Sequence, residues 1–359
     1  MQVGILGLPN VGKSTLFNVL TRSAVPAENY PFCTIAPNVG RVYVPDARLN
    51  HLAELIKPEK VVPAAIEFVD IAGLVKGASR GEGLGNQFLG HVRNVDAVVE
   101  VVRCFFDPNV THVDGELGPL RDIETIETEL ILADLDVVGR RLAKVERQAK
   151  SGERQPQEEL LALRRLEAKL AAGQRAQKED VPTGSDLALL TAKPLLLVAN
   201  VGEEGLKGDS SVAWEEVRIA AAQRGAGALW LSAKLEAELG ELPPEERVLF
   251  LQELGLEEDG LTRLVKASYG LLGLVTFYTT TGGREVRAWA VPEGTPAPVA
   301  AGKIHSDMER GFIRAEVVSY QELVQAGSFA AAREQGRLRL EGRDYLVQDG
   351  DVIHFRFNV

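Results

Sequence analysis

The chain has 359 residues, of which 45% are hydrophobic and 25% charged, so it can bury a large core and form more than one domain. Its 40 basic and 51 acidic side chains give a formal net charge of -11, which argues against a protein that coats nucleic acid or membranes by bulk attraction. The segment MQVGILGLPN has neither the basic region nor the long apolar region typical of a signal peptide, and no later apolar stretch approaches the roughly 20 residues of a membrane helix. A cytoplasmic protein without a membrane partner is expected, with Cys33 and Cys104 as buried thiols in a reducing compartment.

The first expected elements are a strand and a helix joined by a glycine-containing loop. MQVGILGLPNVGKSTLFNVLTR has the spacing G-x-x-x-x-G-K-S of a P-loop, with a β-type run before it and apolar residues at helical spacing after it. In such a loop the backbone N–H groups surround phosphate oxygens, Lys13 reaches the outer phosphates, and the Ser14 hydroxyl binds Mg²⁺. The predicted phosphate-binding residues are Asn10, Val11, Gly12, Lys13, Ser14 and Thr15.

The connection after this helix, AENYPFCTIAPNVG, contains a candidate for a second magnesium hydroxyl. Thr34 lies where a GTPase-type switch I threonine joins Mg²⁺ when a triphosphate is bound. Thr21 and Thr15 are alternatives for the same role, and the position of Thr34 in the connection favours Thr34.

The next run, VVPAAIEFVDIAGLVKGASRGEG, predicts a strand that ends at Asp70 and a D-x-x-G motif that ends at Gly73. Asp70 is placed to hold Mg²⁺, and the backbone N–H of Gly73 is placed to approach the γ-phosphate. The glycine-rich continuation is typical of a switch II segment that the γ-phosphate orders, and a plain flexible loop is the alternative.

The usual water-orienting glutamine after D-x-x-G is replaced by Leu74, which can neither donate nor accept a hydrogen bond. His112, in the loop FDPNVTHVDGELGP after the strand VDAVVEVVRCF, is the candidate catalytic substitute because it accepts a proton near neutral pH. An exposed loop histidine without a role is the alternative.

A helical hairpin is expected next. From about 121 to 150, apolar residues recur at spacings of 4, 3, 4 and 3, which is a heptad pattern, and a second stripe follows the break SGERQPQEE. The two stripes comprise Ile131, Leu135, Val138, Leu142 and Val145, and then Leu160, Leu163, Leu166 and Leu170. The hairpin is either a coiled coil that pairs only with itself or an arm that docks on a large partner.

Two further strands carry the expected base site. AKPLLLVAN ends at Asn200, and GALWLSAK leads into the loop formed by Ser232, Ala233 and Lys234. A guanine site has Asn-Lys-x-Asp where this chain has Asn200, Val201, Gly202 and Glu203. Glu203 is one methylene too long to pair well with the two guanine donors, at a cost of roughly 1 to 3 kcal/mol each, and Val201 lacks the lysine stem that covers the base. Relaxed guanine selectivity is therefore expected, with Asn200 able to read either purine.

The C-terminal segments GREVRAWAV, QELVQAGSFAAAREQG and DYLVQDGDVIHFRFNV predict a mixed β domain with one helix and an Asp-Gly turn. Residues 276–359 carry ten basic and eleven acidic side chains, so almost all of the acidic excess lies elsewhere in the chain.

Taken together, the motifs GLPNVGKS, DIAGLVKGAS, NVGE and the C-terminal AAGKIHSDMERGFIRAEV and LEGRDYLVQDGDVIHFRFNV resemble the YchF or Obg-like ATPase family of TRAFAC-class P-loop NTPases. The resemblance implies an α/β fold with a GTPase-type core (1–118 and 191–275), a helical coiled-coil insert (119–190) and a C-terminal β-grasp domain of the TGS type (276–359). It also implies a preference for ATP and a histidine at the place of His112. Potassium-activated relatives use an Asn at the place of Asn10 to hold K⁺, and local hydrogen bonding is the alternative.

The motifs and the resemblance together lead us to expect a Mg²⁺-dependent, slow ATPase, a monomer, that acts as a switch on the ribosome or its RNA through the insert and the TGS domain. A nucleotide-dependent ribosome adaptor in which hydrolysis is incidental, or a GTPase with relaxed selectivity, is the alternative. A small-molecule kinase shares the P-loop but would have an arginine-bearing lid, where this chain has a heptad hairpin.

Overall fold

The structure is a computed structural model that describes residues 1–22, 38–71, 84–108, 116–150, 153–202, 212–281 and 283–358. The chain forms two compact units. Unit 1 consists of Met1–Gly40 and Glu67–Ser268, and unit 2 consists of Arg41–Ile66 and Tyr269–Val359.

The first six-stranded sheet has the order β2-β4-β1-β5-β6-β7, and the pairs β4–β1, β1–β5, β5–β6 and β6–β7 are parallel. Strands β5 and β6 are buried along their whole length, as expected of central strands covered on both faces. Because the strands are parallel, the carboxyl ends of β1, β4, β6 and β7 meet at one edge of the sheet, where the site is built. The strands are β1 (Gln2–Leu6), β2 (Val39–Tyr43), β4 (Ala65–Asp70), β5 (Ala97–Cys104), β6 (Leu195–Val201) and β7 (Gly227–Leu231).

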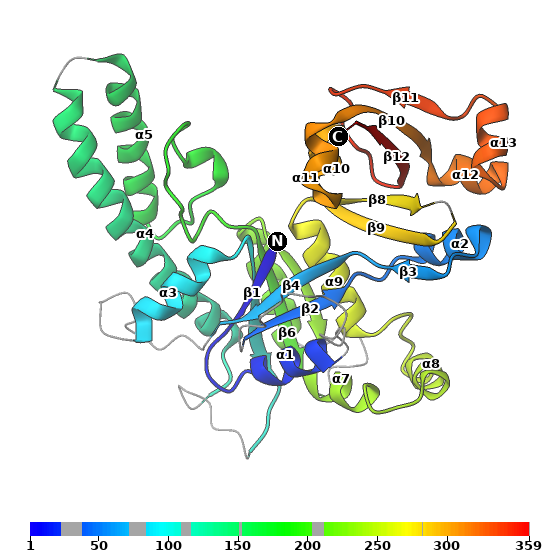
Figure 1. Cartoon of the computed structure of the whole chain (residues 1–359). Coiled ribbons are helices and arrows are strands. Elements are labelled where there is room, and N and C mark those ends of the chain that lie inside the picture. Colours follow the sequence, from blue (N-terminus) through cyan, green and yellow to red (C-terminus); the bar gives the residue numbers. More distant parts are fainter. Residues whose placement is uncertain are drawn as a thin grey trace. The chain divides into compact units, whose positions relative to one another are not determined.

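Helices connect these strands, as Figure 1 shows, and one of them, α9, contains the boundary between the two units. The helices are α1 (Lys13–Arg22), α3 (Leu84–Asn94), α6 (Val212–Gln223), α7 (Ala233–Leu239), α8 (Pro244–Glu253) and α9 (Gly260–Leu271). None of the helices that the structure describes is both long enough and apolar enough to cross a membrane.

The predicted helical hairpin is confirmed: α4 (Pro119–Ala149) and α5 (Arg154–Ala171) lie side by side (Figure 1). Both predicted stripes enter one apolar cluster, in which Val138, Val145 and Leu163 are completely buried. The chain then returns through the short 3-10 helix η3 (Lys178–Asp180). The carboxylate of Asp134, on α4, fastens the returning chain by accepting hydrogen bonds from the backbone N–H groups of residues 190 and 191, both at 2.8 Å.

The second six-stranded sheet has the order β11-β10-β12-β8-β9-β3. One of its faces packs on an apolar cluster that includes Phe277, Phe312 and Phe355, with α10 over it. The strands are β3 (Lys60–Val62), β8 (Leu274–Thr281), β9 (Glu285–Pro292), β10 (Phe312–Ser319), β11 (Arg339–Glu341) and β12 (Asp351–Phe357). The helices of unit 2 are α2 (Ala47–Ile56), α10 (Ala297–Ile304), α11 (Ser306–Arg310), α12 (Tyr320–Ala326) and α13 (Phe329–Glu334). The predicted α/β class with a helical insert and a mixed β domain is confirmed.

Two details differ from the sequence prediction. The run VVPAAIEFVD forms two strands that belong to different sheets. Pro63 has no N–H to donate, so strand hydrogen bonding is interrupted between the end of β3 and the start of β4. The predicted helix in QELVQAGSFAAAREQG is divided into α12 and α13 at Gly327, whose φ of 79° lies in the left-handed region.

The unit boundaries also differ from the expected domains. Residues 41–66, which we expected in the nucleotide-binding core, belong to unit 2, and the later boundary follows Ser268 rather than residue 275. Within unit 2, β3 pairs in parallel with β9. Arg48, on α2, donates to the Asp349 carboxylate at 2.6 Å, and these contacts explain why the segment belongs there.

Candidate functional site

The loop between β1 and α1 has the backbone geometry of a phosphate cradle. Gly12 has a φ of 90°, which only glycine adopts without strain. A Cβ on Gly7 would lie 2.7 Å from the Val101 carbonyl oxygen, and a Cβ on Gly12 would collide with the Asn200 amide nitrogen. Both glycines of the motif are therefore required by this fold.

Asn10 also has a positive φ, of 65°, and asparagine tolerates the left-handed region better than most other residues. This conformation gives a backbone reason for asparagine at this position. Its assignment to K⁺ stays a prediction.

Lys13 and Asp70 form an ion pair at the carboxyl edge of the sheet. The pairing of β1 with β4 places Asp70 opposite Ile5, and the Lys13 ammonium contacts the Asp70 carboxylate Oδ1. The Lys13 side chain is 9% exposed and that of Asp70 is 20% exposed, so both charges are largely shielded from water. Ser14 and Thr15 are exposed in the first turn of α1, which carries no acidic residue. The arrangement therefore places a cation, a carboxylate, a hydroxyl and a helix N-terminus at one edge of the sheet.

Asn200, at the end of β6, joins the phosphate loop to the predicted base loop. Its side-chain amide donates from Nδ2 to the Val11 carbonyl at 2.8 Å, and its Oδ1 accepts the backbone N–H of Ala233 at 2.9 Å. Asn200 is only 4% exposed. The amide NH₂ has two N–H donors and the amide oxygen has two lone pairs, so one N–H and one lone pair of Asn200 remain for a ligand. We call these two bonds the Asn200 clamp.

The predicted base loop begins α7. Ser232 is the N-cap of this helix, and its hydroxyl accepts the N–H of Leu235 at 3.4 Å. Ala233 is buried and Lys234 is exposed. Val201 is 3% exposed and therefore offers little area to a base.

One turn further along α7, the buried carboxylate of Glu236 accepts the N–H of Gly260 at 2.7 Å and so holds the start of α9. Burial raises the pKa of Glu236 to about 7. Nothing in the sequence pattern indicated this contact, because the two residues are 24 positions apart.

Four predicted site residues, Thr34, Gly73, His112 and Glu203, lie outside the described residues, as do Leu74 and Cys33. Among the alternatives to Thr34, the Thr21 hydroxyl donates a hydrogen bond to the Phe17 carbonyl at 2.9 Å within α1.

Glu100, in the middle of β5, is a buried charge that sequence reasoning missed. It is 3% exposed, and its Oε1 has no hydrogen-bond partner among the described residues. Burial raises its pKa to about 8, and Arg175 and Glu127 are the charges that act on it most strongly. A lone acidic residue inside the apolar run VVEVV was the signal that would have found it.

Cys104, at the end of the same strand, is confirmed as a buried thiol. Burial raises its pKa to about 12, so it stays protonated and unreactive at neutral pH.

Two family descriptions match the chain. Residues 2–166 match the family described as a 50S ribosome-binding GTPase, and residues 274–358 match the C-terminal family of YchF-type GTPases, described as a protein of unknown function. Among curated proteins, the chain is 52% identical to the ribosome-binding ATPase YchF of Bacillus subtilis, over 100% of both chains. It is 50% identical to the protein of the same name from Haemophilus influenzae, over 100% of this chain and 99% of that one.

A solved structure agrees with these matches. The YchF GTPase of Schizosaccharomyces pombe superposes with a TM-score of 0.88 and 33% identity, over 99% of this chain and 97% of that chain. A GTP-binding protein of Pyrococcus horikoshii, 20% identical with a TM-score of 0.62, shares the fold.

Proposed function

Because the chain belongs to the YchF family, we propose that it hydrolyses nucleoside triphosphates and binds the ribosome, with Mg²⁺ as cofactor and ATP preferred over GTP. The observation that carries the proposal is the ion pair of Lys13 with Asp70 beside the glycine loop. It brings together the two opposite charges that a magnesium–triphosphate complex needs.

In the proposed complex, the backbone N–H groups from Asn10 to Thr15 surround the phosphates, and Lys13 turns from Asp70 to the outer phosphate oxygens. Asp70 and the Ser14 hydroxyl would hold Mg²⁺, and Thr34 would be a further ligand in the triphosphate state. Serine and carboxylate oxygens are ligands that Mg²⁺ accepts together with phosphate and water, so the residues present fit this ion. When bound, Mg²⁺ neutralises the charge that develops on the phosphates.

Hydrolysis needs a group that orients the attacking water, and we assign this role to His112, with the Gly73 N–H on the γ-phosphate. Replacing His112 by alanine is expected to slow turnover under saturating ATP while nucleotide affinity stays unchanged. We assign K⁺, if it is required, to Asn10. These assignments rest on the sequence motifs and on the resemblance to the family.

The base would lie between the segment from Asn200 to Glu203, in which the buried Val201 side chain offers little area, and the loop Ser232, Ala233 and Lys234. The Asn200 clamp supports this arrangement, because it fixes the base loop relative to the phosphate loop. The longer Glu203 side chain is expected to weaken guanine pairing and so to relax guanine selectivity. The preference for ATP is proposed from the resemblance to the family.

The test is a set of calorimetric dissociation constants for ATP and GTP with Mg²⁺. We expect ATP to bind more tightly in the natural protein. The double variant Val201→Lys with Glu203→Asp restores Asn-Lys-x-Asp and is expected to shift the preference toward GTP by about tenfold or more, since a restored pair of hydrogen bonds is worth at least 1.4 kcal/mol. A natural protein that prefers GTP by tenfold would contradict the proposed base selectivity.

Ribosome binding is tested separately, by co-sedimentation in ATP, ADP and nucleotide-free states with a parallel single-turnover hydrolysis assay. A switch predicts that binding depends on the nucleotide and that ribosomes change the hydrolysis rate. If ribosomes bind but leave the rate unchanged, the chain is instead an adaptor.

A further inference from the structure

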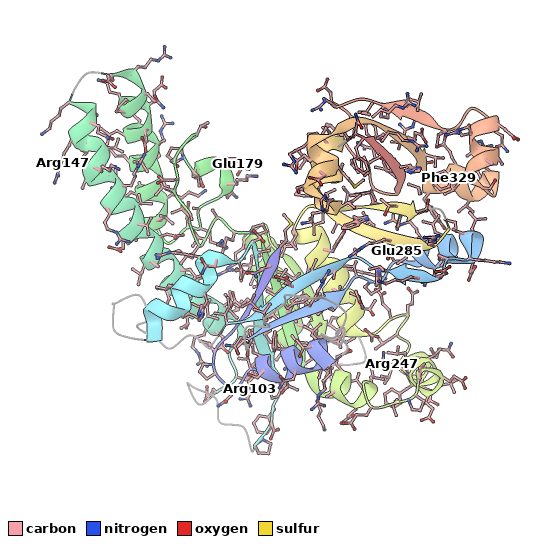
Figure 2. All side chains as sticks on the ribbon, in the orientation of Figure 1. Arg103, Arg147, Glu179, Arg247, Glu285 and Phe329 are labelled. Carbon is pink, nitrogen blue, oxygen red and sulfur yellow. The ribbon has the colours of Figure 1, made fainter. Side chains whose placement is uncertain are left out.

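Unit 2 contains a charged hollow that none of the motifs explains. It has a volume of about 510 Å³ and lies on the face of the second sheet opposite the apolar cluster. We call it the arginine hollow; its lining residues are Arg314, Glu316, Arg333, Leu338, Leu340 and Arg356. A second hollow adjoins it, shares four of these residues, and adds Phe329, which Figure 2 labels on α13, together with His354 and Glu334.

The strands themselves create the concentration of positive charge. In the antiparallel pair of β10 and β12, Arg314 lies opposite Arg356, and Glu316 lies opposite His354. Like charges directly opposite each other destabilise a sheet, so this pair has an energetic cost that an anion would relieve. Arg333 adds a third guanidinium from α13.

Glu316 positions two of the three arginines. Its side chain is 8% exposed, and it accepts two hydrogen bonds from Arg356, both at 3.1 Å, and one from Arg333 at 3.2 Å. The Arg356 hydrogen bonds hold the pKa of Glu316 below its usual value, so the carboxylate stays charged. The side chains of Arg333 and Arg356 are 63% and 46% exposed, so their remaining N–H groups face solvent in a fixed orientation.

The carboxylate does not cancel the charge. Arg314 is exposed and forms no ion pair with any carboxylate in the part of the chain that the structure describes. Burial and the nearby Arg356 lower the pKa of His354, so the histidine is neutral at pH 7. Three guanidinium groups therefore face one carboxylate in the arginine hollow, within a chain of net charge -11.

We propose that the arginine hollow binds backbone phosphates of RNA and is a contact between unit 2 and the ribosome, an inference that rests on the proposed ribosome binding. A planar guanidinium group can donate two parallel hydrogen bonds to one phosphate. Because the three arginines come from β10, β12 and α13, they suit the successive phosphates of an RNA chain better than one isolated phosphate ion. The 62%-exposed Leu340 and the Phe329 ring add apolar surface for ribose and base.

The test uses the full-length protein and a short fluorescent single-stranded RNA, with anisotropy measured over a range of salt concentrations. Arg314→Gln and Arg333→Gln are each expected to weaken binding about three- to tenfold and to reduce the slope of log affinity against log salt by about 0.7, the value for one lost phosphate contact. The matched control is Arg310→Gln, which removes the same charge from a side chain that is 77% exposed on α11, and it is expected to leave affinity and slope unchanged.

Circular dichroism melts check that the three variants fold, and ribosome co-sedimentation runs in parallel. If Arg314→Gln and Arg333→Gln match the control in affinity and slope, the arginine hollow is not an RNA site. If polyglutamate binds with the same arginine dependence while RNA does not, the occupant is an acidic protein segment and the proposal is overturned. If the natural protein does not co-sediment with ribosomes, the proposed ribosome binding is contradicted. Arginine-dependent RNA binding in the anisotropy assay would still support the arginine hollow as an RNA site.

Discussion

At the scale of single residues, the Asn200 clamp leads to a specific prediction about stability. Asn200→Ala leaves the Val11 carbonyl and the Ala233 N–H without partners in buried surroundings. Because each unsatisfied buried group costs about 1 to 3 kcal/mol, the free energy of unfolding of unit 1 is expected to fall by about 2 to 5 kcal/mol in urea titrations. The matched control is Asn18→Ala, at an exposed position of α1, which is expected to change it by about 0.5 kcal/mol or less. Equal stabilities of the two variants would contradict the clamp.

The other residue-scale prediction concerns Glu100 and pH. A glutamate in the unfolded chain releases its proton near pH 4.5, whereas the folded protein keeps the Glu100 proton up to about pH 8. Its contribution to stability is therefore complete below pH 4.5 and is lost as pH rises toward 8. Glu100→Gln, which keeps a neutral side chain, is expected to match the natural protein near pH 5 and to exceed its free energy of unfolding by roughly 2 to 4 kcal/mol near pH 8.

Urea titrations of Glu100→Gln from pH 5 to 8.5 measure this difference. Glu167→Gln, at an exposed position of α5, is the control and should follow the natural protein throughout. Parallel curves for Glu100→Gln and the natural protein would show that Glu100 is ionised over this range.

At the scale of elements, the helical insert offers a matched pair of leucines. Leu163 is completely buried between α4 and α5, while Leu161, on the same helix, is 58% exposed. Leu163→Ala is expected to destabilise the hairpin by about 2 to 5 kcal/mol through the cavity it leaves. Leu161→Ala is expected to change stability by less than about 0.5 kcal/mol, since alanine is at least as good a helix former. Amide hydrogen exchange in α4 and α5 measures the stability of the hairpin in both variants. Equal protection in the two variants would contradict the buried packing of Leu163.

The helices and strands of unit 1 show which features local sequence patterns can predict. The hairpin and the strands β5 and β6 were predictable because a heptad repeat and an uninterrupted apolar run each identify one kind of burial. The phosphate loop was predictable because its glycines and lysine act within one short segment. The Asn200 clamp and the contact of Glu236 with Gly260 were not, because their partners are distant in sequence and no repeating pattern connects them.

At the scale of the whole molecule, the sequence predicted the class of fold but not the membership of residues 41–66. Their strand β3 has only three residues, and its partner β9 lies more than half the chain away. The local sequence does not indicate this pairing, because a strand of three residues cannot be distinguished from a short extended segment beside a turn. The roles of Thr34, Gly73, His112 and Glu203 stay predictions, because these residues lie outside the described part of the chain.

The pairing of Lys60 with Glu285 has a consequence for biosynthesis. Translation proceeds from the N-terminus, so β3 emerges early and has no strand to join until almost the entire polypeptide has been made. A C-terminal fragment that begins at Tyr269 would lack this strand and expose the edge of β9, which favours aggregation. Autonomous expression of unit 2 therefore requires a fusion that restores residues 41–66.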